Sequence, residues 1–128
     1  MNDNTSRVLV VDDNRVNRIK ATRALKTGNY DVSEAAGGQE ALDMLRGQVF
    51  HLVLLDILMP EVDGFQVLEQ MQNDQQLAQI PVIMVSAVEE EEDVRKCMAM
   101  GAVDYITKPF DVEVLQGRVR SNLKKAPR

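Results

Sequence analysis

The sequence predicts a single α/β domain built around a parallel sheet, and three observations support that class. Five short apolar segments alternate strictly with five longer segments of helical character. The apolar runs at 52–55 and 81–86 lack polar alternation, which is typical of strands that are buried on both faces. The connections are short, and 128 residues is the size of one domain, so helices are expected on both faces of one sheet.

The expected strands are short and mostly rich in valine, leucine and isoleucine. They span residues 7–11, 31–35, 51–56, 81–86 and 103–107. Pro81 is compatible with its strand because it stands at the first position. The segment 31–35 alternates only weakly and is the least apolar of the five.

The expected helices are bounded by residues that start or stop helices. They span 14–27, 39–46, 64–73, 89–100 and 111–123. Gly28, Gly47 and Gly101 follow three of them, and Asp111 is the expected N-cap of the last. The apolar residues expected to face the sheet are Val16, Ile19, Ala24, Leu25, Ala41, Leu42, Leu45, Phe65, Val67, Leu68, Met71, Val112, Val114, Leu115, Val119 and Leu123.

Composition and charge exclude several classes of protein. The net charge of −5 disfavours nucleic-acid binding by this domain. No apolar run approaches the roughly 20 residues of a membrane span, and the polar N-terminus does not resemble a signal peptide. Cys97 is the single cysteine, so no internal disulfide is expected and Cys97 is interpreted as a packing residue. These observations favour a cytoplasmic location.

Polar residues lie at the carboxyl ends of four of the expected strands. They are Asp12 and Asp13, Asp56, Ser86, and Thr107 and Lys108. In a parallel sheet these ends lie along one edge, where ligands bind in open α/β sheets. Three carboxylates gathered there would repel one another without a cation, and oxygen ligands suit Mg²⁺. The lysine and a hydroxyl suit a phosphoryl group, so the set fits phosphoryl transfer onto a carboxylate. Taken singly, each residue also fits a cap or an exposed turn.

Four motifs in this order resemble the receiver domain of bacterial two-component response regulators. They are Asp12-Asp13, LLDILMPEVDG at 54–64, Ser86-Ala87 after PVIMV, and GAVDYITKPF at 101–110. The resemblance covers nearly the whole chain. It implies a flavodoxin-like, doubly wound (βα)₅ sandwich with strand order 2-1-3-4-5 over residues 7–123. Residues 1–6 would be an N-terminal tail, and 124–128 a C-terminal tail or the start of a linker to an output domain.

The resemblance also implies a phosphoacceptor and a metal site. Asp56 would receive a phosphoryl group from a sensor histidine kinase or a histidine phosphotransfer protein. Asp13 would bind Mg²⁺ or Mn²⁺ directly, Asp12 mainly through water, and the backbone carbonyl of Leu58 would supply another ligand. The domain would be a signalling phosphoacceptor that promotes its own phosphorylation, rather than an enzyme.

The remaining implied roles concern the switch. Lys108 would bind a phosphoryl oxygen, and the Lys108–Pro109 bond is expected to be cis. Ser86 would move toward the phosphoryl group, and Tyr105 would turn inward with it. The fourth helix, fifth strand and fifth helix would then signal to an output domain or partner protein. Homodimer formation stays open, and neither direct nucleic-acid binding nor membrane association is expected.

Two apolar positions predict slow loss of the phosphoryl group. Leu58 and Val88 lie two positions after Asp56 and Ser86, where the family varies and where side chains affect dephosphorylation. Neither side chain can orient a water molecule by hydrogen bonding. A long-lived phosphorylated state is therefore expected.

Three other functions are compatible with a similar fold. A Mg²⁺-dependent aspartyl-phosphate phosphohydrolase would need a second acid two positions after its nucleophile, where this chain has Leu58. A phosphorylation-independent interaction module would not need the intact acidic, hydroxyl and lysine set. A flavin-binding protein would need a phosphate-binding Ser/Thr/Gly loop after the first strand, which is missing here.

Overall fold

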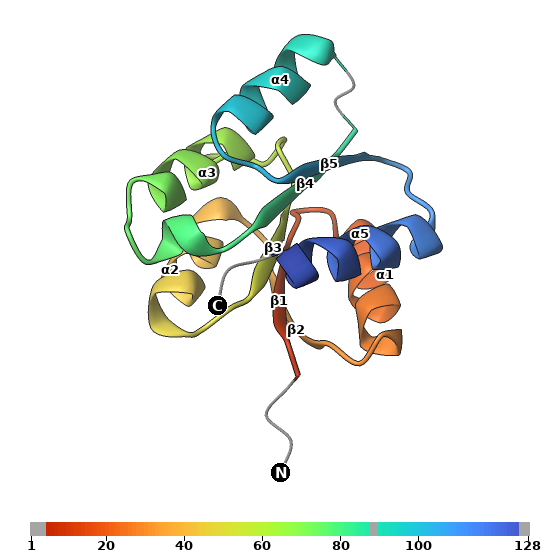
Figure 1. The fold of residues 1–128 in the computed structure, drawn as a ribbon. Coiled ribbons are helices and arrows are strands. Elements are labelled where there is room, and N and C mark those ends of the chain that lie inside the picture. Colours follow the sequence, from red (N-terminus) through yellow and green to blue (C-terminus); the bar gives the residue numbers. More distant parts are fainter. Residues whose placement is uncertain (1–4, 88–89, 126–128) are drawn as a thin grey trace.

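A five-stranded parallel sheet forms the centre of the computed structural model, which describes residues 5–87 and 90–125 (Figure 1). The strands are β1 (Arg7–Val11), β2 (Asp31–Ala35), β3 (Leu52–Leu55), β4 (Val82–Ser86) and β5 (Asp104–Thr107). They lie in the order β2-β1-β3-β4-β5, and every neighbouring pair is parallel. The doubly wound order implied by the resemblance is therefore confirmed.

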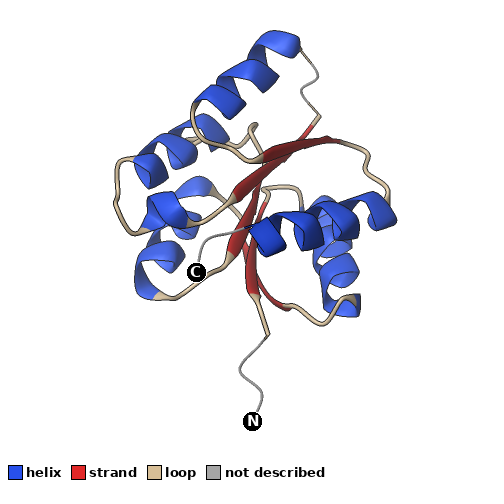
Figure 2. Ribbon diagram, viewed as in Figure 1, coloured by secondary structure: helices blue, strands red, loops and turns tan. Residues whose placement is uncertain are grey.

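Helices cover both faces of the sheet, as Figure 2 shows. They are α1 (Arg15–Thr27), α2 (Gly38–Gly47), α3 (Gly64–Gln72), α4 (Glu91–Ala99) and α5 (Val112–Lys125), and a 3₁₀ turn, η1 (Leu77–Gln79), precedes β4. Helices α1 and α5 lie on one face, and α2, α3 and α4 lie on the other (Figure 1). The turn η1 was not predicted from the sequence.

Alternation along the strands divides the core into two layers. In β1, Leu9 and Val11 belong to the cluster under α2–α4, whereas Val8 and Val10 belong to the cluster under α1 and α5. All four residues of β3 are at most 2% exposed, as expected for a central parallel strand. Cys97 is fully buried in the first cluster, and burial raises the pKa of its thiol to about 11. The packing role of Cys97 is thus confirmed.

Three residues expected to face the sheet are exposed instead. Val16 is 75% exposed because it stands nine residues before the buried Leu25, about two and a half helical turns, on the opposite side of α1. Val114 is 45% exposed because it stands five residues before the buried Val119, which turns its side chain about 140° away around α5. Val112, the first residue of α5, is 38% exposed. For these three residues the sequence-based expectation was wrong.

Several element boundaries also differ from the expected ones. Strand β4 begins at Val82 and β5 at Asp104, each one residue late, and α5 continues to Lys125, past the expected boundary at 123. Helix α4 begins at Glu91, while Val88 and Glu89 lie outside the described residues. Asp111 accepts a hydrogen bond from the main-chain N–H of Glu113, so its expected capping role at α5 is confirmed. Among the helices of the described segments, none has the length and apolar character needed to cross a membrane.

Thr22 on α1 gives a first testable prediction. Its side chain is buried, and its hydroxyl has no hydrogen-bond partner among the described residues. Because an unsatisfied buried hydroxyl destabilises the folded state, Thr22→Val should raise the free energy of unfolding by about 1 kcal/mol, measured by urea denaturation. Thr22→Ser keeps the hydroxyl and loses a methyl group, so it should lower stability. A Val variant less stable than the wild type would contradict the prediction.

Candidate functional site

The predicted site residues meet at the carboxyl edge of the sheet. Their main-chain N–H groups continue the parallel hydrogen-bond pattern past the strand ends. Asp12, Asp56 and Lys108 donate to the carbonyl oxygens of Ala35 (3.2 Å), Val11 (3.0 Å) and Ser86 (2.9 Å), respectively. The side chains that follow the strands are therefore held on rigid main chain, and the convergence predicted from the sequence is observed.

A buried ion-pair cluster occupies the centre of the site. The Lys108 Nζ atom lies 2.6 Å from an Asp12 carboxylate oxygen and 3.3 Å from an Asp56 carboxylate oxygen. Asp12 and Asp56 are only 6% and 5% exposed. The second oxygen of Asp12 accepts a hydrogen bond of 2.8 Å from the main-chain N–H of Asn14. One lysine thus lies between two buried acids, so that a positive charge is available beside the Asp56 carboxylate.

The three acids at this edge form a candidate site for a divalent cation. Asp12, Asp13 and Asp56 each offer one carboxylate oxygen, and these oxygens lie within 4.8 Å of one another. Two ligands on opposite sides of Mg²⁺ are about 4.2 Å apart, given metal–oxygen distances near 2.1 Å. All the donor atoms are oxygen. To bind the ion, the carboxylates need only move slightly closer together, or one of them can bind through a bridging water. The residues therefore fit Mg²⁺.

The environment of Asp56 disfavours its charged form. Burial is the largest cause that raises the pKa of this carboxyl, and the nearby Asp12 raises it further. Lys108 and a hydrogen bond with Ser86 lower it, but the net pKa remains above the ordinary aspartate value. Any additional cation at the acidic cluster would favour ionised Asp56, which is the form that can act as a nucleophile.

The raised pKa of Asp56 predicts a pH-dependent gain in stability when its charge is removed. The folded chain holds this proton to higher pH than the unfolded chain, so ionised Asp56 destabilises the fold above its folded pKa. With a chelator present, Asp56→Asn should raise Tm at pH 7.5, and the gain should shrink as pH falls toward the ordinary value of about 3.9. Asp63→Asn is the control, because asparagine also caps the start of α3. An unchanged or lower Tm for the Asp56 variant at pH 7.5 would contradict the prediction.

Ser86 and Tyr105 stand next to the acidic cluster on the neighbouring strands. Ser86 ends β4 and is fully buried, while Tyr105 on β5 is half-buried and packs against the core under α2–α4. Burial raises the pKa of the Tyr105 phenol, and a hydrogen bond with Ser86 lowers it by less. Since Ser86 also hydrogen-bonds Asp56, its hydroxyl lies between the acid and the phenol.

The loop after β3 is packed closely against the start of α3. A Cβ atom on Gly64 would lie 2.3 Å from the Asp56 carbonyl oxygen, so only glycine fits there. Its N–H donates to the Ile57 carbonyl at 2.8 Å. Within the loop, the Leu58 side chain is 60% exposed and offers no polar group beside Asp56. The Lys108–Pro109 bond is cis, as expected.

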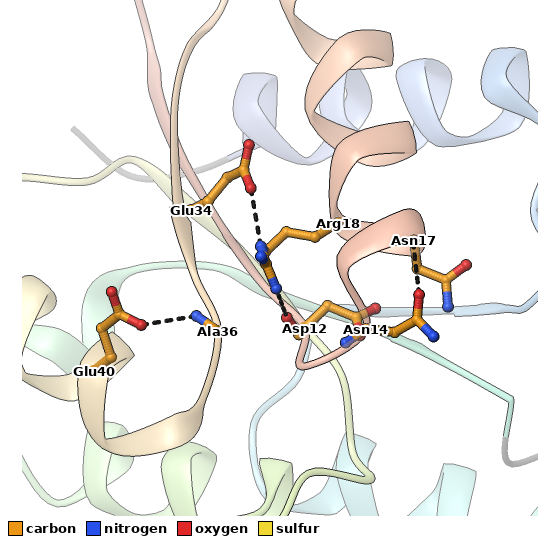
Figure 3. Close-up of polar contacts among 7 residues, drawn as sticks. All are labelled: Asp12, Asn14, Asn17, Arg18, Glu34, Ala36 and Glu40. Carbon is orange, nitrogen blue, oxygen red and sulfur yellow. Dashed lines mark hydrogen bonds and ion pairs between the residues drawn. The ribbon is translucent and has the colours of Figure 1, made fainter.

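Sequence reasoning did not identify the polar contacts that hold the β1–α1 turn. Asn14 caps α1 by accepting a hydrogen bond of 3.0 Å from the main-chain N–H of Asn17 (Figure 3). Arg18 contacts both the Asp12 carbonyl and the Glu34 carboxylate. From the sequence, Arg18 is only one member of a basic stripe on α1, which also includes Arg15, Lys20, Arg23 and Lys26. No local signal therefore distinguishes it from its neighbours.

Comparisons with known proteins agree with this geometry. The response regulator receiver domain family matches residues 8–120. The DNA-binding dual master transcriptional regulator RpaA of Synechocystis is 36% identical over 128 residues, which cover 95% of this chain and 51% of that protein. Response regulator PleD of Caulobacter vibrioides is 37% identical over 117 residues, covering 91% of this chain and 26% of PleD. The chain thus spans about half or less of the length of these relatives.

Solved structures of similar proteins share the fold. A CheY-like response regulator receiver domain protein from Methanospirillum hungatei superposes with a TM-score of 0.89 at 27% identity, covering 95% of this chain and 96% of that one. A probable two-component system response regulator/GGDEF domain protein gives a TM-score of 0.89 at 32% identity, covering 96% of this chain and 51% of that one.

Proposed function

The chain belongs to the receiver domains of response regulators, and from this premise we propose that Asp56 is its phosphoacceptor. The observation that carries the proposal is the placement of Asp56. It is a buried carboxylate at the end of the central strand β3, 3.3 Å from Lys108 and beside two further acids. A phosphohistidine on a sensor histidine kinase or histidine phosphotransfer protein is the donor class that we propose.

The chain itself supplies the nucleophile and one of the positive charges that the chemical step needs. A carboxylate oxygen of Asp56 attacks phosphorus, the bond between phosphorus and the donor imidazole nitrogen breaks, and the nitrogen keeps the electron pair. Lys108 already lies between Asp12 and Asp56, so a small rotation brings Nζ to an oxygen of the transferred group. The exposed, apolar Leu58 supplies no general acid for rapid turnover, which favours a signalling phosphoacceptor over a phosphohydrolase.

Mg²⁺ or Mn²⁺ is the proposed cofactor. Asp13 and Asp56 would hold it directly, Asp12 through water, and the Leu58 carbonyl would complete the protein ligands. Bound there, the ion would offset the negative charge of the carboxylates and of the phosphoryl oxygens. Asp13 suits direct ligation because it is exposed and not paired with Lys108, whereas Asp12 is already held by Lys108 at 2.6 Å.

The proposed switch uses Ser86 and Tyr105. Phosphorylation adds charge and acceptor oxygens next to the Ser86 hydroxyl, which also hydrogen-bonds Tyr105. A change at Asp56 can therefore alter β5 and its neighbours α4 and α5. This surface exposes Met98, Val103 and Val114. We propose it as the contact for an output domain or partner protein, with homodimer formation left open. A cytoplasmic location completes the proposal, since the unpaired Cys97 suits a reducing compartment.

The proposal is tested by incubation with Mg²⁺ and acetyl phosphate, followed by intact-mass measurement. We expect addition of one phosphoryl group, localised to Asp56 by peptide mapping and prevented by a chelator. Continuous release of phosphate without a stable adduct would favour the phosphohydrolase. Absence of both an adduct and Mg²⁺ binding would favour the phosphorylation-independent module.

The lifetime of the adduct gives a further prediction at Leu58. Leu58→Asn places a hydrogen-bonding group beside Asp56, where it can orient a water molecule. Loss of the phosphoryl group should accelerate at least about tenfold, less than the roughly 10²–10⁴-fold of a full general acid or base. Radiolabel decay after removal of donor measures the rate, with Leu58→Met as the apolar control. Equal decay rates in the two variants would contradict the prediction. Val88, the other apolar position expected to slow dephosphorylation, lies outside the described residues.

A further inference from the structure

Two basic side chains of α1 bind the main chain of two of the loops that carry the site, those after β1 and β5. The first is Arg18, whose Nη1 donates to the Asp12 carbonyl at 2.8 Å. Its Nε pairs with a Glu34 carboxylate oxygen at 2.9 Å (Figure 3). The Arg18 side chain is 16% exposed and that of Glu34 is 36% exposed, so the guanidinium is mostly covered while its carboxylate partner faces solvent. Glu34 on β2 thus orients the guanidinium that holds the main chain of Asp12.

The second is Lys20, which binds the loop between β5 and α5. Its Nζ donates to the Phe110 carbonyl at 2.8 Å and lies 4.5 Å from the centroid of the Phe110 ring. Phe110 is 7% exposed and stands two residues after Lys108. The contact joins residues 90 positions apart, so it connects α1 to the segment that presents Lys108.

The sheet alone does not set the distance between Asp12 and Lys108. These residues follow β1 and β5, which are separated by β3 and β4 in the strand order. Strands in a sheet are about 4.8 Å apart, so the ends of β1 and β5 are about 14 Å apart, yet the two side chains meet at 2.6 Å. The loops and side chains must therefore span this gap, and α1 is an element that contacts both loops.

We propose that Arg18 and Lys20 are positioning residues, which hold Asp12-Asp13 and Lys108 in the relative positions that phosphoryl transfer needs. The inference rests on the proposed function of Asp56. Arg18 acts through the main chain of Asp12, so it should matter mainly for the metal site. Lys20 acts through the loop that carries Lys108, so it should matter mainly for the transfer step. A substitution that only destabilised the fold would instead lower Mg²⁺ affinity and the labelling rate together.

The test compares four variants by thermal unfolding, Mg²⁺ calorimetry and labelling by acetyl phosphate at saturating Mg²⁺. Arg18→Lys keeps the charge but loses the two-pronged geometry, and Mg²⁺ affinity should fall about tenfold. Lys20→Met should slow labelling about tenfold while Mg²⁺ affinity stays within about twofold. Lys20→Arg should restore most of the rate. Arg23→Met is the matched control, because Arg23 lies on the same helix and makes no side-chain hydrogen bond or ion pair with the described residues.

The outcomes separate this inference from the proposed function. Labelling of Lys20→Met at the rate of Arg23→Met, or wild-type Mg²⁺ affinity in Arg18→Lys, would overturn the positioning role. Failure of the wild type to take up a phosphoryl group would instead overturn the function of Asp56. If Lys20→Met does not fold, Lys20→Gln replaces it, with the same expected loss of rate.

Discussion

Replacing Asp56 with asparagine should abolish phosphoryl transfer to this chain. The amide has nearly the shape of the carboxylate but lacks the negatively charged oxygen that attacks phosphorus. Lys108 keeps its contact of 2.6 Å with Asp12, so much of the site should persist. Intact mass after incubation with acetyl phosphate and Mg²⁺ should show one added phosphoryl group in the wild type and none in the variant.

The control for this experiment is Asp63→Asn. Asp63 lies on the same loop and caps α3, but it is not part of the acidic cluster. That variant should be labelled at the wild-type rate. Labelling of Asp56→Asn to the same extent as Asp63→Asn would show that another residue accepts the phosphoryl group.

Replacing Gly64 with alanine should strongly destabilise the fold and disturb the site. The added Cβ would lie 2.3 Å from the Asp56 carbonyl oxygen and 2.7 Å from the Ile57 Cα. Both atoms belong to the main chain, so neither can rotate away, and the loop must move instead. The free energy of unfolding should fall by about 3 kcal/mol, as in overpacked cores, and labelling of Asp56 should slow in the folded fraction. Urea denaturation and mass measurement check the two effects.

A matched glycine on α5 separates this steric effect from the general effect of a glycine-to-alanine change. Gly117 stands within α5, and its Cβ would meet nothing within 4 Å in the described part of the chain. Gly117→Ala should raise the free energy of unfolding by up to about 1 kcal/mol, because alanine favours helix. A Gly64→Ala variant as stable as the wild type would show that the loop absorbs the methyl group.

The sequence by itself determined the strand positions and the members of the site. Asp12, Asp56 and Lys108 each follow directly after a strand, and for Asp12 and Asp56 the end of an apolar run marks the end of that strand. Parallel strands bring their carboxyl ends to one edge, so the local position of each residue was enough to predict that they meet. Ser86 belongs to the same set because it ends β4, whereas Tyr105 lies within β5 and was added only by the resemblance.

Only the tertiary structure decided which side chains support that site. The exposure of Val16 and the need for glycine at position 64 depend on which neighbours each residue packs against. Arg18 and Lys20 belong to a basic stripe in which the sequence shows no difference between one residue and the next. Their contacts with Asp12 and Phe110 form because α1 packs between distant segments. Local patterns encode the periodicity of one element, whereas such contacts depend on how two elements lie against each other.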